Sequence, residues 1–161
     1  MEIIKEIISS KELLILIYSA IPLTELRVAI PLAITVWHVK PIIALILAII
    51  GNSLPIVVII LSLNKIVELA ERYSKFLTKI LEAIFRRTRR KTSQQFEKYG
   101  LLALCLFVAI PLPMTGAWTG SIAAWLFGVP VRKAFLPIFC GVIIAGIIVT
   151  ILTVGTVAIL K

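Results

Sequence analysis

Long apolar runs dominate the hydrophobic pattern of this chain. Residues 41–63 contain no charged side chain over 23 positions, and residues 134–160 contain none over 27. A helix needs about 20 apolar residues to cross the hydrocarbon core of a bilayer. The pattern therefore predicts two membrane-spanning helices, one in each half of the chain.

Two other apolar stretches contain residues that a lipid-exposed helix avoids. Residues 19–32 read SAIPLTELRVAIPL, and residues 109–120 read AIPLPMTGAWTG. Lipid cannot satisfy the hydrogen bonds of irregular backbone, so such backbone inside a membrane must face protein or a wet cavity. We expect these two stretches to form one functional centre.

The two halves of the chain repeat each other at an offset of 89 to 90 residues. The sequence Ala20-Ile21-Pro22-Leu23 matches Ala109-Ile110-Pro111-Leu112, and Gly51 matches Gly141. Each half is therefore predicted to be an irregular apolar segment, a short break and a full span.

This repeat allows two topologies. If residues 13–37 and 101–128 cross the membrane fully, the halves are parallel repeats. If these segments are re-entrant helical hairpins, each half crosses once and the second half is inverted. Inversion places Arg132 and Lys133 on the same side as the basic segment between the halves, as the positive-inside rule favours. We therefore favour hairpins, whose tips would face each other near the middle of the membrane.

A basic amphipathic segment separates the halves. Ten of the 17 basic residues lie between Lys65 and Lys98, and apolar side chains recur there at helical spacing. This predicts a cytoplasmic helix beside anionic lipid. Thr92 and Gln95 resemble a capping box, which predicts a short second helix. The residues expected to contact lipid headgroups are Arg86, Arg87, Arg89, Arg90 and Lys91.

The predicted organisation is a single membrane domain of four segments. Residues 1–12 alternate charge with isoleucine pairs and predict an interfacial helix. Residues 13–63 form the first repeat, residues 64–100 the cytoplasmic helical segment, and residues 101–161 the second repeat. The predicted fold is an all-α integral membrane protein with two inverted repeats, each a re-entrant helical hairpin followed by a transmembrane helix.

The composition supports a membrane protein. The apolar fraction is 60% and the mean hydropathy is +1.09, whereas soluble domains carry roughly 45–50% apolar residues. The net charge of +9 does not indicate nucleic-acid binding, because it is concentrated beside a predicted span. The sequence shows no nucleophile–base arrangement, phosphate-binding glycine loop or metal-ligand spacing. We therefore expect neither an enzyme nor a cofactor or metal.

Glu25 and Arg27 are ionisable residues well inside an apolar run. Placing either charge in hydrocarbon costs about 3 kcal/mol. In a functional interpretation, Glu25 accepts a proton or binds a cation, and Arg27 holds an anion such as phosphate. In a structural interpretation, the two residues pair with each other, or Arg27 reaches a lipid headgroup. Pairing at a spacing of i,i+2 requires non-helical backbone.

Small, polar and aromatic residues of the two interrupted stretches and the first span complete a candidate substrate path. Each of them is also a residue type that packs helices or satisfies backbone groups inside membranes. The candidate path residues are Pro22, Thr24, Pro31, Asn52, Pro111, Pro113, Thr115, Gly116, Trp118, Thr119 and Gly120.

The sequences TELRVAIPLAI at residues 24–34 and FVAIPLPMTGAWTG at residues 107–120 closely resemble a known family. It is the Putative small multi-drug export protein family of prokaryotes, which is distantly similar to the DedA/VTT membrane proteins. The resemblance implies re-entrant hairpins that meet near the middle of a prokaryotic plasma membrane.

This resemblance also implies a role for Glu25. In DedA-like proteins a glutamate near a PxPGE-type first tip is linked to proton-dependent function, and Pro22-Leu23-Thr24-Glu25 matches that position. The second tip departs from the DedA pattern, because Phe107-Val108-Ala109-Ile110-Pro111 lacks the arginines usually found around an FIPG-type segment. DedA/VTT relatives move lipids, which adds lipid to the candidate cargoes.

We therefore expect a transporter or lipid translocase, coupled to a proton or another cation, that moves a small amphiphile or an anionic lipid. The expected partners are membrane lipids, this substrate and a second copy of the chain in a homodimer, but no nucleic acid. Two alternatives stay open. One is a non-transporting membrane scaffold that docks a partner through the basic helix, and the other is a channel with four full crossings.

Overall fold

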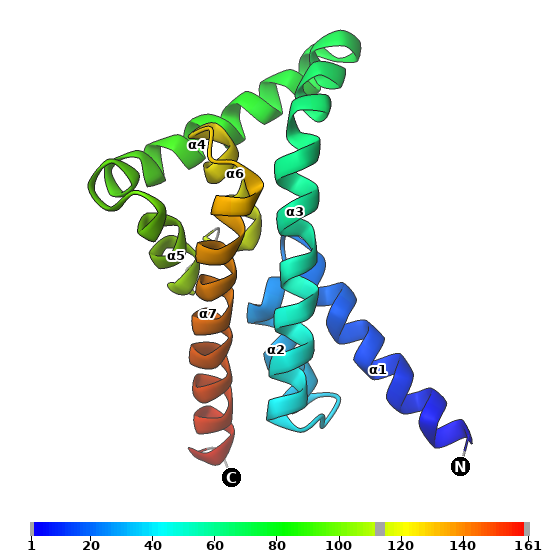
Figure 1. Cartoon of the computed structure of the whole chain (residues 1–161). Helices are drawn as coiled ribbons and strands as arrows, with labels where there is room; N and C mark the ends of the chain where they lie inside the picture. The colour runs from blue at the N-terminus through cyan, green and yellow to red at the C-terminus, as the bar shows by residue number, and fades with distance from the viewer. Residues whose placement is uncertain (1, 112–114, 160–161) are drawn as a thin grey trace. The chain divides into compact units, whose positions relative to one another are not determined.

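The computed structural model describes residues 2–111 and 115–159, and within these ranges the chain is helical apart from turns and short connections (Figure 1). No strand occurs in either described range, which confirms the predicted all-α class. The described helices are α1 (Glu2–Ala20), α2 (Glu25–Thr35), α3 (Pro41–Tyr73), α4 (Lys75–Tyr99), α5 (Leu101–Ala109), α6 (Ala117–Leu126) and α7 (Val131–Ile159).

Helices α3 and α7 contain the two predicted spans. With 33 and 29 residues, both are long and apolar enough to cross a membrane. Only 39% and 28% of the residues in their most apolar windows are buried, so many of their apolar side chains face outward. A soluble protein rarely exposes such large apolar surfaces. The two helices therefore indicate a membrane protein.

The chain divides into two compact units. One unit comprises Met1–Pro55 and Val142–Lys161, and the other comprises Ile56–Gly141. The first unit therefore contains α1, α2 and parts of α3 and α7, and the second contains α4, α5, α6 and the remaining parts of α3 and α7.

In the first unit, α1 packs against α2 and the beginning of α3 lies against α1. The interior is apolar, with Ile15, Leu26 and Ile30 almost completely buried. Gly51 of α3 permits a very close contact, because a β-carbon at this position would lie 2.5 Å from the carbonyl oxygen of Leu16. A side chain larger than hydrogen would therefore force α3 away from α1.

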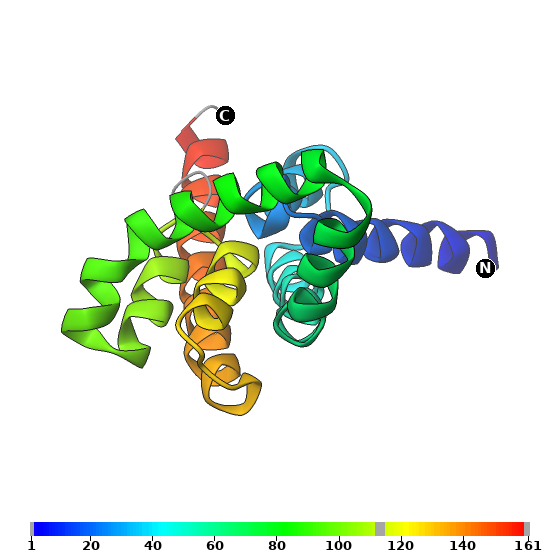
Figure 2. The same ribbon diagram turned by 90° about the horizontal axis from the view of Figure 1, so that it is seen from above.

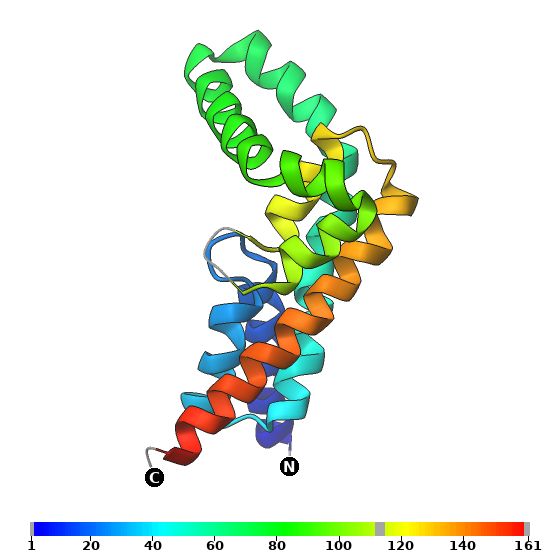
Figure 3. The ribbon, with the colours of Figure 1, turned by 90° about the vertical axis from the view of Figure 1, so that its left-hand side faces the viewer.

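In the second unit, α5 packs against α6, and α4 lies against both helices (Figure 2). Figure 3 shows α5, α6 and the first part of α7 side by side. Leu104 and Ile138 are fully buried in this core. A β-carbon at Gly141 of α7 would lie 2.7 Å from the carbonyl oxygen of Cys105 in α5. The long helix again approaches the backbone of the helix before the turn.

These two close contacts recur at the spacing of the sequence repeat. Gly141 follows Gly51 by 90 residues, and Cys105 follows Leu16 by 89. The connection into each long helix recurs too, because His38 and Gly128 have φ angles of 54° and 66°, three residues before α3 and α7 begin. A left-handed conformation carries little steric cost for glycine but a real one for histidine.

The helix boundaries differ from the predicted segment boundaries in three places. Helix α1 runs without a break through residues 12 and 13. Helix α4 is also unbroken, so the predicted capping box at Thr92 is wrong: the hydroxyl of Thr92 instead donates to the carbonyl oxygen of Thr88 at 2.8 Å. Both threonines are buried, which keeps this face of α4 continuous. The helix break falls at Ser74, whose Oγ accepts a hydrogen bond from the amide of Leu77 at 3.3 Å.

We predict that Gly51→Ala and Gly141→Ala each lower the thermal unfolding temperature of the protein in detergent micelles. Both substitutions place a methyl group against backbone oxygen, which cannot rotate away, and overpacking of this kind costs about 1–3 kcal/mol. Gly155→Ala is the matched control, because a β-carbon there meets nothing within 4 Å. That variant should be at least as stable as the native protein, since alanine is the better helix former. Equal stability of all three variants would contradict the proposed contacts.

Candidate functional site

The turn between α1 and α2 holds the charged residues singled out by the sequence. Thr24 precedes α2, and its hydroxyl donates a hydrogen bond to the carbonyl oxygen of Tyr18 in α1. Glu25 begins α2 with a φ angle of 45°, and its amide donates to the carbonyl oxygen of Ile21 at 2.9 Å. A left-handed glutamate costs of order 1 kcal/mol or more and persists only where its surroundings fix it.

Glu25 and Arg27 form an ion pair. Nη2 of Arg27 lies 3.9 Å from Oε2 of Glu25, and the two side chains are 18% and 7% exposed. In a regular helix, residues two apart point to different faces. The left-handed backbone at Glu25 is the departure from helical geometry that the pairing interpretation requires. This charge pair lies at the N-terminus of α2, whose other buried residues are apolar.

Asn52 is the second polar feature of this unit. Its side chain is 1% exposed, and no described residue forms a hydrogen bond with its Oδ1. The preceding residue, Gly51, approaches Ser19 in the last turn of α1, so Asn52 lies at the level from which the turn to α2 begins. A buried amide oxygen without a partner costs about 1–3 kcal/mol. The amide oxygen of Asn52 is therefore a buried acceptor whose hydrogen-bonding capacity is not used by the described residues.

Thr115, in the described part of the connection between α5 and α6, makes a contact related to that of Thr24. Helix α5 ends at Ala109, and the hydroxyl of Thr115 donates to the carbonyl oxygen of Ile110 at 2.8 Å. Thr24 and Thr115 thus make the same kind of contact, from the end of a turn back to the end of the preceding helix. The interpretation of these threonines as groups that satisfy the backbone fits both contacts.

The candidate path residues fall into both units. Those of the first unit are Pro22 in the turn, Thr24, Pro31 within α2, and Asn52 in α3. Those of the second unit are Pro111, Thr115, Gly116, Trp118, Thr119 and Gly120, of which Thr115, Gly116 and Gly120 are buried. Pro113 lies outside the described residues.

The basic cluster lies along the middle of α4. Arg86, Arg87, Arg89 and Arg90 are exposed, and the side chain of Lys91 lies outside the described part of the chain. The same helix exposes apolar side chains before the cluster, with Phe76 72% and Ile80 42% exposed. An exposed apolar face followed by arginines suits the surface of an anionic membrane.

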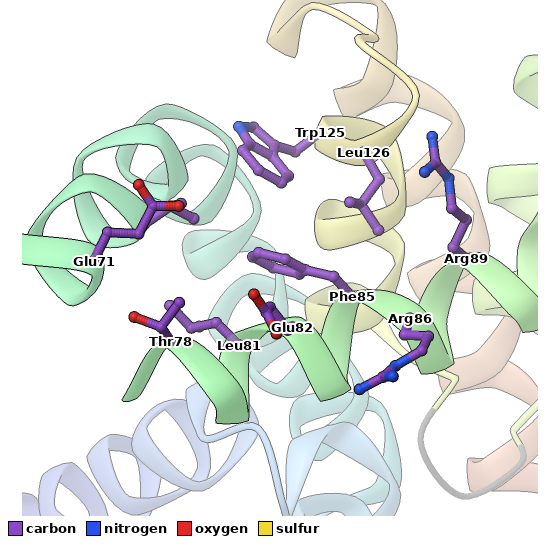
Figure 4. A pocket seen from close by; sticks show the side chains of 10 residues that line it. Glu71, Thr78, Leu81, Glu82, Phe85, Arg86, Arg89, Trp125 and Leu126 are labelled. Atoms are coloured by element: carbon purple, nitrogen blue, oxygen red, sulfur yellow. The ribbon is translucent and has the colours of Figure 1, made fainter. Parts of the chain in front are cut away.

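The sequence did not predict a cavity of about 500 Å³ in the second unit (Figure 4). It lies between the end of α3, the first half of α4 and the end of α6. The sequence feature that could have predicted this cavity is a helical spacing, which places four lining side chains on one face of α4: Thr78, Glu82, Phe85 and Arg89. The lining residues are Val67, Glu71, Thr78, Leu81, Glu82, Phe85, Arg86, Arg89, Trp125 and Leu126. Among the described residues, no group of three His, Cys, Asp or Glu side chains is arranged to hold a metal ion.

We predict that Arg27→Gln destabilises the protein in detergent by about 2 kcal/mol, because it removes the cationic partner of a buried carboxylate. The double variant Glu25→Gln/Arg27→Gln should recover most of this loss, since it leaves no buried charge behind. Thermal unfolding of the single and double variants gives the coupling, and Arg87→Gln, on the exposed surface of α4, is the control. If the loss in the double variant equals the sum of the losses in Arg27→Gln and Glu25→Gln, the ion pair contributes nothing.

Comparison with known proteins gives one match. A family model described as "Putative small multi-drug export protein" matches residues 25–148. No curated protein and no solved structure matches the chain. The family match begins at Glu25, within the first interrupted stretch, and includes the whole of the second. It covers well over half of the 161 residues. The chain therefore belongs to the Putative small multi-drug export protein family.

Proposed function

We propose that this chain is a membrane exporter of small amphiphiles, coupled to a proton or another cation through Glu25. The carrying observation is the Glu25–Arg27 ion pair at the start of α2, where the carboxylate is buried and the guanidinium side chain is 18% exposed. The name of the family supports export as the function. The two long apolar helices support the membrane as its location.

The proposed coupling follows from the neutrality of the pair. Buried together, the carboxylate and guanidinium offset each other's charge, whereas either one alone is strongly penalised. A proton or cation that binds Glu25 weakens its ion pair with Arg27. An anionic group that binds Arg27 weakens the same ion pair. Substrate and coupling ion then act on the same pair, which is the minimum that coupled transport requires.

We further propose that α1–α2 and α5–α6 are re-entrant hairpins in inverted repeats. Helices α2, α5 and α6 have 11, 9 and 10 residues. At 1.5 Å per residue these helices are roughly 14–16 Å long, about half of the hydrocarbon core. None of the three is long enough to cross a bilayer, which argues against a channel with four full crossings. The matched contacts of Gly51 and Gly141 support the repeat.

The proposed substrate path runs along the two turns, with the candidate residues of each unit contributing polar groups. The cargo is a small amphiphile or an anionic lipid, and Arg27 suits an anionic headgroup because guanidinium binds phosphate bidentately. The arginines of α4 would hold that helix against anionic lipid on the cytoplasmic side of a prokaryotic plasma membrane. A homodimer would enlarge the small core of one copy.

We predict that Glu25→Gln lowers transport at least about tenfold, the scale expected when a buried charge contact is lost. The assay uses proteoliposomes with an imposed proton gradient, ethidium as a cationic amphiphile and fluorescently labelled phosphatidylglycerol as an anionic lipid. Glu68→Gln, at an exposed site in α3, removes the same charge and should transport at the native rate. Native-rate transport by a folded Glu25→Gln protein would rule out the proposed role of Glu25.

The scaffold alternative predicts no transport in proteoliposomes, and it makes the opposite prediction for the variants in cells. If the chain only docks a partner through α4, reversing the charge of Arg86–Lys91 abolishes its function in cells, and Glu25→Gln has no effect. If a folded Glu25→Gln protein loses its function, this result therefore favours the transporter over the scaffold.

The inverted topology predicts that cysteines introduced at Lys40 and Lys133 label from opposite sides of the membrane. Both positions are exposed and lie beside the start of a long helix. The labelling uses a membrane-impermeant maleimide on oriented vesicles, in a protein whose Cys105 and Cys140 have been replaced by alanine. Labelling from the same side would show parallel repeats instead.

A further inference from the structure

The cavity beside α4 carries four charged side chains, two acidic and two basic. Glu71 comes from α3, and Glu82, Arg86 and Arg89 come from α4. The side chains of these four residues form no ion pair or hydrogen bond with any described residue. Figure 4 shows Glu71 and Arg89 on opposite sides of the Phe85 and Trp125 rings. Glu71 therefore lies on one side of the aromatic rings and Arg89 on the other, and Glu82 and Arg86 lie one helical turn apart on α4.

The aromatic wall between Glu71 and Arg89 is fixed in place. The rings of Phe85 and Trp125 have centroids 5.1 Å apart and an interplanar angle of 37°. Nε1 of Trp125 donates a hydrogen bond to Oδ1 of Asn64 at 2.8 Å. Asn64 follows directly after Leu63, where the apolar run of α3 ends. The cavity therefore lies where a membrane-spanning segment gives way to polar sequence.

We propose that this cavity binds a zwitterionic amphiphile, with its cationic group beside Glu71 and Glu82 and its anionic group beside Arg86 and Arg89. Carboxylates and aromatic faces both attract an organic cation. Arginine is the side chain best suited to a phosphate. Val67, Leu81 and Leu126 provide apolar contact for the alkyl part of the ligand.

The charge balance favours a ligand with both charges over simpler ligands. Two carboxylates and two guanidinium groups line the cavity, so a plain cation attracted by one pair is repelled by the other, and the same holds for a plain anion. A ligand that carries both charges satisfies both pairs. The cavity volume of about 500 Å³ is also in the range of small-molecule sites.

Binding is measured on the full-length protein in neutral maltoside micelles. Trp37→Phe/Trp118→Phe leaves Trp125 as the one tryptophan of the chain, so its fluorescence reports the cavity. Three probes share a six-carbon chain and differ in charge: hexylphosphocholine, hexyltrimethylammonium and hexyl phosphate. We expect saturable binding of hexylphosphocholine that is roughly tenfold tighter than that of either singly charged probe, as the gain of a second charge-assisted contact predicts.

Matched variants separate the site from general electrostatics. Glu71→Gln/Glu82→Gln and Arg86→Gln/Arg89→Gln should each abolish the preference for hexylphosphocholine. Lys75→Gln/Lys79→Gln removes the same charge from the same helix at positions that do not line the cavity, and should leave binding unchanged. All six substituted side chains are exposed, so folding should be preserved.

Three results would overturn the proposal: equal affinity for all three probes, tightest binding of a singly charged probe, or an equal loss in the Lys75/Lys79 variant. Dihexanoylphosphatidylcholine identifies the source of the ligand. Binding as tight as that of hexylphosphocholine supports a membrane lipid, and much weaker binding supports a free single-chain amphiphile. The measurement involves no transport, so its outcome is independent of the proposed function.

Discussion

The contact between a long helix and the backbone of the helix before the turn is the constraint on which each unit depends. Gly51 and Gly141 have no space for a β-carbon, because the carbonyl oxygens of Leu16 and Cys105 occupy it. Backbone oxygens cannot move without moving a whole helix, so these two contacts fix the distance of α3 from α1 and of α7 from α5. In the first unit, Gly51 also approaches Ser19, one residue before α1 ends. The turn that carries Glu25 is thereby held at a defined height on α3.

Once the turns are fixed, their backbone must be satisfied in apolar surroundings. Thr24 and Thr115 do this by donating hydrogen bonds to carbonyl oxygens at the ends of α1 and α5. A carbonyl left unpaired in hydrocarbon would cost several kcal/mol. The two turns share this solution although one is charged and the other is not. The shared threonine contact therefore satisfies the backbone, whereas the charged pair Glu25–Arg27 is present only in the first turn.

Run length and spacing made much of this structure predictable. The apolar runs at 41–63 and 134–160 identified α3 and α7, and the repeat identified the two turns and the equivalent glycines. The left-handed conformation of Glu25 could not be predicted, because it depends on tertiary contacts that hold a non-glycine residue there. The cavity was also missed: it needs the reversal of direction at Ser74, which no glycine or proline marks.

The proposed exporter depends on which member of the ion pair the substrate displaces. An anion that binds Arg27 removes the charge that stabilises the Glu25 carboxylate, so anion binding favours protonation of Glu25. By linkage, protonation favours anion binding to the same extent. An anionic substrate and a proton would then move together. A cationic substrate instead competes with the proton for Glu25, and competition for one site is the basis of exchange. Export driven by an inward proton gradient requires exchange, so the pair suits a cationic cargo for export and an anionic cargo for uptake or for movement between leaflets.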